Sequence, residues 1–97
     1  IVKIALSLES KNKGRAIYFS RIAIPHGANI FYKHIGVYCF RRNTLKRFVN
    51  LKYSILEKFE KLEQLRALED GIRIDVGLVK SAPVSVDRPS DIKKLIY

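Results

Sequence analysis

Two kinds of short apolar segment alternate along this chain, and their order limits the folds it can adopt. The alternation typical of β-strands is found in residues 1–8, 15–20, 34–40 and 72–79. Helical spacing is found in residues 43–50 and 54–71, and again from about Pro89. The polar turn "ESKNKG" predicts a hairpin between the first two strands, and Asn43 is the expected N-cap of the first helix. Strands separated by helices indicate an α/β fold, and 97 residues make one small domain.

"HIGVYCF", residues 34–40, is typical of a buried strand that carries a polar pair on one face. Alternation places His34 and Tyr38 on the same side. On spacing alone, a satisfied and half-buried pair is the more frequent arrangement, and a functional pair is the alternative. We expect Cys39, on the opposite face, to be a small buried side chain. A single cysteine forms no internal disulfide and is consistent with a reducing compartment such as the cytoplasm.

The longest helical segment carries clear start and stop signals. Ser54 and Glu57 form an S-x-x-E capping box, and Gly71 marks the expected C-terminal end. The leucines between them recur every three residues, so the apolar surface winds around the helix. This pattern predicts cover on more than one side, including cover by a partner subunit. Glu63 falls on the apolar side, which indicates either an ion pair with Arg66 or a ligand.

The formal net charge of +10 suggests an anionic partner, namely nucleic acid, a phosphorylated ligand or an acidic membrane surface. The basic residues are spread along the chain, with no block of five to eight. Most aromatic residues lie in segments that also resemble core strands. We therefore expect that the chain does not bind nucleic acid. A small basic nucleic-acid-binding module is the alternative. The sequence contains no run of 18 apolar residues, so it predicts no membrane-spanning helix. It also contains no complete standard catalytic motif.

The loop "SAPVSVDRPSD" contains Asp87 at the mouth of the last expected helix. Asp87 is either the N-cap of that helix or a magnesium ligand, since Mg²⁺ binds carboxylate and substrate oxygens. The chain opens inside an apolar segment and without methionine, so we expect it to be part of a longer protein.

Four segments together suggest a family. They are "GRAIYFSR", "HIGVY", "LEKFEKLEQLRALEDGIRI" and "VDRPSDI". In this order and spacing they closely resemble the C-terminal part of bacterial 3-deoxy-manno-octulosonate (Kdo) cytidylyltransferases, over nearly the whole chain. The resemblance implies the C-terminal half of a Rossmann-like nucleotidyltransferase fold, a mixed sheet with flanking helices. Residues 1–97 would then be one partial domain for sugar binding and dimerisation, without the N-terminal CTP-binding half.

The resemblance also implies a reaction. Members of this family join CTP to Kdo, release pyrophosphate and make CMP-Kdo for lipopolysaccharide, with Mg²⁺ holding the phosphates. A cytoplasmic homodimer is expected, and the chain alone should be inactive. A relic of such an enzyme with no function of its own is a further alternative.

The matching motifs imply roles for individual residues. The residues expected to face the sugar are Arg21, His34, Tyr38, Glu63 and Gln64. Arg21 would pair with the sugar carboxylate, and Glu63 and Gln64 would bind hydroxyl groups. Asp87 would be the magnesium ligand. The last loop reads "PVSVDRPSD", without the two glycines usual in the family and with Arg88 in place of its threonine.

Overall fold

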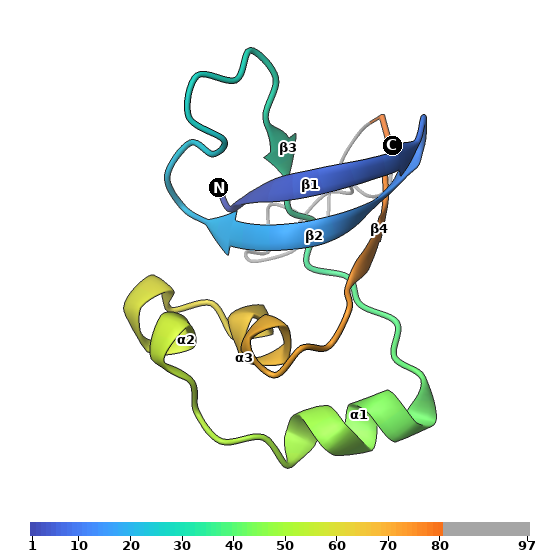
Figure 1. Cartoon of the computed structure of the whole chain (residues 1–97), viewed down its shortest axis with the longest axis vertical. Helices are drawn as coiled ribbons and strands as arrows, with labels where there is room; N and C mark the ends of the chain where they lie inside the picture. The colour runs from blue at the N-terminus through green and yellow to red at the C-terminus, as the bar shows by residue number, and fades with distance from the viewer. Residues whose placement is uncertain (81–97) are drawn as a thin grey trace, which may run out of the picture.

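The computed structural model describes residues 1–80, which form a four-stranded sheet and three short helices (Figure 1). The strands are β1 (Lys3–Ser10), β2 (Lys13–Ser20), β3 (Tyr32–Lys33) and β4 (Asp75–Gly77). The helices are α1 (Arg42–Val49), α2 (Ile55–Glu60) and α3 (Gln64–Glu69). In Figure 1, α2 and α3 lie on one side of the sheet, and α1 lies further from the strands. The predicted α/β class is confirmed.

The sheet has the strand order β3–β1–β2–β4, and each of its three pairings is antiparallel. The mixed character that the resemblance implied is therefore not seen within the described part of the chain. The predicted hairpin is confirmed, because β1 pairs with β2 along its length. Gly14 allows the two strands to approach closely. A Cβ atom at this position would lie 2.9 Å from the carbonyl oxygen of Ser7.

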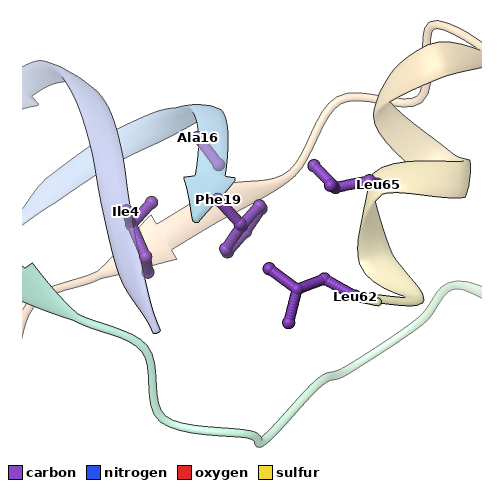
Figure 2. Close-up of a cluster of buried hydrophobic side chains, with 5 residues drawn as sticks. All are labelled: Ile4, Ala16, Phe19, Leu62 and Leu65. Carbon is purple, nitrogen blue, oxygen red and sulfur yellow. The ribbon is translucent and has the colours of Figure 1, made fainter. Parts of the chain in front are cut away.

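One hydrophobic cluster joins the hairpin to the helices. Its buried members are Ile4, Ala16, Phe19, Leu62 and Leu65 (Figure 2). Phe19 and Leu65 are the most deeply buried, at 1% and 0% exposure. Figure 2 shows the side chains of β1 and β2 pointing toward those of Leu62 and Leu65, which come from the start of α3 and the turn before it. The position of α3 therefore depends on the hairpin.

The single helix predicted for residues 54–71 is wrong, because the segment forms two short helices. Lys61 ends α2 in the left-handed conformation with φ 58°, and α3 begins at Gln64. The capping box of Ser54 and Glu57 and the stop at Gly71, with φ 79°, are present as predicted. Leucines three residues apart drift around a continuous helix. Here Leu62 lies in the turn before α3 and Leu65 within α3, and both belong to the core cluster.

The predicted strand at 34–40 is also wrong. Only Tyr32–Lys33 pairs with β1, and the backbone N–H of His34 adds one bond to the carbonyl oxygen of Val2 at 2.8 Å. Because β1 itself begins at Lys3, the chain beyond His34 has no strand beside it and leaves the sheet. Cys39, predicted to be buried, is consequently exposed.

Two other local predictions have different outcomes. Residues 72–79 alternate as predicted, with the even-numbered side chains less exposed than their neighbours, although only Asp75–Gly77 forms a strand. The helix predicted at 43–50 is confirmed as α1, but Arg41 occupies the N-cap position in place of Asn43. The last predicted helix lies outside the described residues. Up to residue 80, no helix is long and apolar enough to cross a membrane.

The contact between α3 and the hairpin predicts a large effect of truncating Leu65. Leu65→Ala should lower the free energy of unfolding by about 2–5 kcal/mol, because it leaves a cavity in a fully buried site. Leu8→Ala removes the same atoms from an exposed side chain and should cost less than about 1 kcal/mol. Urea denaturation of the two variants measures both values. Equal losses would contradict the assigned core.

Candidate functional site

A hollow of about 740 Å³ opens beside α3, between α1 and the segments that precede α1 and β4. Three of the residues predicted to face a sugar line it, namely Tyr38, Glu63 and Gln64. They come from two parts of the sequence that are 25 residues apart, and the fold brings both to one cavity. The hollow is therefore the strongest candidate for a ligand site among residues 1–80.

His34 does not line this hollow, but it holds Tyr38. The Tyr38 Oη and His34 Nε2 atoms lie 2.6 Å apart. Burial raises the pKa of Tyr38 to about 12 and lowers the pKa of His34 below 6.5. Near neutral pH the phenol is therefore protonated and the imidazole neutral, so Tyr38 donates and His34 accepts. The pair predicted on one strand face exists, although no strand carries it.

Other aromatic rings contact both members of the His34–Tyr38 pair. The His34 ring meets the edge of Phe19 with centroids 5.4 Å apart, which ties it to the core. On the other side, Tyr38 lies 6.3 Å from Phe40, and Phe40 lies 5.6 Å from Phe48 of α1. These ring contacts connect the sheet to α1 along one wall of the hollow.

Gln64 has the least satisfied polar group at the site. Its side-chain Nε2 is buried and has no hydrogen-bond partner in the described structure. A buried donor without an acceptor costs about 1–3 kcal/mol, so an acceptor brought by a ligand would bind favourably there. Glu63, beside it, is exposed at the N-cap position of α3 and makes no capping bond.

A partly buried ion pair joins α3 to α2. Arg66 donates from Nε and Nη2 to the two carboxylate oxygens of Glu57, at 2.8 and 2.6 Å. Of the two alternatives for Glu63, the ion pair with Arg66 is not seen, because the guanidinium of Arg66 is paired with Glu57. The ligand alternative stays a prediction. The hydrogen bonds from Arg66 hold the pKa of Glu57 below its usual value. The rings of Phe48 and Tyr53 lie 5.6 and 5.8 Å from the guanidinium, within cation–π distance.

Arg21 lies apart from the hollow. Its guanidinium donates to the carbonyl oxygens of Glu60 at 3.4 Å and Lys61 at 3.0 Å, where α2 ends. It thus binds free carbonyls at a helix C-terminus, which is a common arginine role. Its pairing with a sugar carboxylate stays a prediction.

The sequence analysis missed the arginines of the hollow, which are Arg41, Arg47 and Arg73. Arg47 is bound to Asp70 at 2.7 Å, and Arg73 to Asp75 at 2.8 Å and to Glu9. The pairs Arg41–Arg42 and Lys46–Arg47 were visible in the sequence as local concentrations of charge. Nothing in the sequence indicated that they face the same cavity as Gln64.

The metal prediction falls outside the described residues, because Asp87 lies beyond residue 80. Within residues 1–80, no group of three or more His, Cys, Asp or Glu side chains could hold a metal ion.

A sequence model of the family described as Cytidylyltransferase matches residues 3–74, about three quarters of the chain. The chain belongs to this family. This chain is 52% identical over 94 residues to the 3-deoxy-manno-octulosonate cytidylyltransferase of Sinorhizobium medicae. The match covers 97% of this chain and 38% of that protein. It is 55% identical over 83 residues to the enzyme of the same name from Rickettsia prowazekii, covering 86% and 34%.

A solved structure shows the same relation in three dimensions. It is CMP:2-keto-3-deoxy-manno-octonic acid synthetase complexed with CTP, and it superposes with a TM-score of 0.80 at 36% identity. The match covers 97% of this chain and 39% of the other. The chain therefore spans less than two fifths of the length of these relatives, and the predicted resemblance to a part of such enzymes is confirmed.

The contact between His34 and Tyr38 predicts a pH dependence. His34 should titrate below 6.5, because burial disfavours the imidazolium. Below about pH 6.5 the unfolded chain then binds more protons than the folded chain, so the free energy of unfolding should decrease as the pH falls. Histidine NMR measures the titration, with His34→Asn to assign the signal. In the Tyr38→Phe variant the pKa should stay low, because burial is its cause. A midpoint at or above 6.5 would contradict this account.

Proposed function

We propose that this chain forms the sugar-binding part of a 3-deoxy-manno-octulosonate cytidylyltransferase, which joins CTP and Kdo and releases pyrophosphate. The observation that carries the proposal is the hollow in which Tyr38, Glu63 and Gln64 meet. The names of the relatives from Sinorhizobium medicae and Rickettsia prowazekii support the same reaction.

The chemistry of the hollow suits a polyhydroxylated acid. Gln64 offers a buried amide donor that has no acceptor within residues 1–80. Glu63 offers an exposed carboxylate as acceptor, and the Tyr38 oxygen can accept once its proton is committed to His34. The arginines of the hollow favour an anion. Such groups on separate elements bind and orient a sugar by several directional bonds, which is how positioning contributes to catalysis.

The reaction also needs parts that these eighty residues do not supply. In the proposal, CTP binds mainly to a region outside this chain, and Asp87 helps to hold Mg²⁺. When bound, the ion neutralises charge on the nucleotide phosphates. The residues described here would bind the sugar and hold its attacking hydroxyl. Cytoplasmic location belongs to the same proposal, and the exposed thiol of Cys39 is consistent with it.

A hybrid enzyme tests the function. The chain replaces its counterpart in the Sinorhizobium medicae relative, and pyrophosphate release is measured with CTP, Kdo and Mg²⁺. We expect turnover that depends on both substrates, and none from the chain alone. Gln64→Leu should raise the KM for Kdo about tenfold, because a buried hydrogen bond is lost. Asn29→Leu removes an exposed amide elsewhere and is the control. A folded hybrid that binds CTP but uses no Kdo would contradict the proposal.

A homodimer is the second part of the proposal. Ile55 and Phe59 lie one turn apart on α2 and are 67% and 78% exposed. Two large apolar side chains on one helix face indicate a surface that a second copy could cover. Phe59→Lys should shift the hybrid from dimer to monomer in sedimentation velocity, whereas Lys58→Ala, beside it, should not. A Phe59→Lys variant that stays dimeric would exclude this surface.

A further inference from the structure

We propose that the guanidinium of Arg41 binds the carboxylate of the sugar acid in the hollow. This inference rests on the proposed function for the identity of the ligand. It assigns to Arg41 the role that the sequence motifs implied for Arg21.

The first argument is the state of the arginines that line the hollow. Arg47 donates from Nε and Nη2 to Asp70, at 2.9 and 2.7 Å. Arg73 donates to Asp75 and to Glu9. Arg41 has no hydrogen bond or ion pair from its side chain to any residue in the described range 1–80. It is therefore the arginine of this hollow whose five N–H donors are available to a ligand there.

The second argument is the position of Arg41. It stands at the N-cap of α1 with extended backbone, φ −70° and ψ 147°, directly after the segment that carries Tyr38. Its charge acts on Asp75, which lines the same hollow. The pKa of Asp75 is lowered chiefly by the hydrogen bond from Arg73, and the positive charge of Arg41 adds to that effect. Asp75 accepts a hydrogen bond from Arg73, and no hydrogen bond joins Asp75 to Arg41 among the described residues.

The third argument is the state of Arg21. Two backbone carbonyls at the end of α2 already accept bonds from its guanidinium. A ligand at Arg21 would have to replace these bonds, and the break between α2 and α3 would lose its support. A carboxylate that reaches Arg41 displaces no protein partner among the described residues. An arginine–carboxylate pair is also among the stronger charge-assisted contacts.

A small carboxylate tests the anion site independently of the sugar. The 97-residue chain is titrated with acetate, and NMR follows the Nε–H signals of its arginines. We expect the Arg41 signal to shift and saturate in the millimolar range. Arg42→Gln, a neighbour that does not line the hollow, should leave the effect intact, and Arg41→Gln should remove the saturable shifts of residues around the hollow. If acetate shifts the Nε–H signal of Arg21 and leaves that of Arg41 unchanged, the inference is overturned.

The hybrid enzyme then separates the two anionic substrates. Arg41→Gln should raise the KM for Kdo about tenfold and leave the KM for CTP unchanged, and Arg41→Lys should restore part of the loss. A rise confined to the KM for CTP would assign Arg41 to a phosphate and overturn the carboxylate assignment. An unchanged KM for both substrates would also overturn it. A parent hybrid without Kdo-dependent turnover would contradict the proposed function. The acetate titration would still test whether Arg41 binds a carboxylate.

Discussion

Phe19 is the side chain on which both the fold and the candidate site depend. It is almost fully buried and packs with Ile4, Leu62 and Leu65, so it joins the hairpin to the start of α3. The edge of the same ring meets His34, which in turn holds the hydroxyl of Tyr38. One aromatic residue of β2 therefore links the two sides of the hollow. Any loss of packing at Phe19 is transmitted to groups that it does not touch.

Most of the arginines in and around the hollow are already paired within the protein. Arg66 is enclosed between Glu57 and two aromatic rings, so its charge stabilises α3 and is not presented to a ligand. Arg47 and Arg73, which also line the hollow, are bound to the carboxylates of Asp70 and Asp75. The large positive charge of the chain therefore says little by itself about ligand binding. Ligand binding depends on the charged and polar groups of the hollow that have no protein partner, such as Gln64 Nε2.

Signals between close neighbours in the sequence predicted their structures well. The hairpin around Gly14, the capping box of Ser54 and Glu57, and the stop at Gly71 are all present. Each depends on contacts within a few residues, or on a backbone conformation that favours glycine. The motifs also indicated the family, and three of the residues they singled out, Tyr38, Glu63 and Gln64, line one cavity. For the hairpin, the capping box and the stop, local chemistry was sufficient.

Predictions that needed a distant partner failed. An apolar, alternating segment at 34–40 forms no strand, because β1 begins at Lys3 and offers nothing beyond His34 to pair with. Helical spacing continued past Lys61, but the chain takes the left-handed conformation there and begins a second helix at Gln64. Strand pairing and core packing depend on residues far away in the sequence, and the periodicity of one segment does not identify that distant partner.

The sequence by itself determined the chain's family, its α/β class, its hairpin, and the capping box and glycine stop of the 54–71 segment. Only the tertiary structure decided which charges are already neutralised and which remain available. Arg66 and Arg21 are committed to Glu57 and to two carbonyl oxygens, while Arg41 faces the hollow without a partner among residues 1–80. The reason is physical, since an arginine's availability depends on the groups within hydrogen-bond reach, and folding alone brings those groups together.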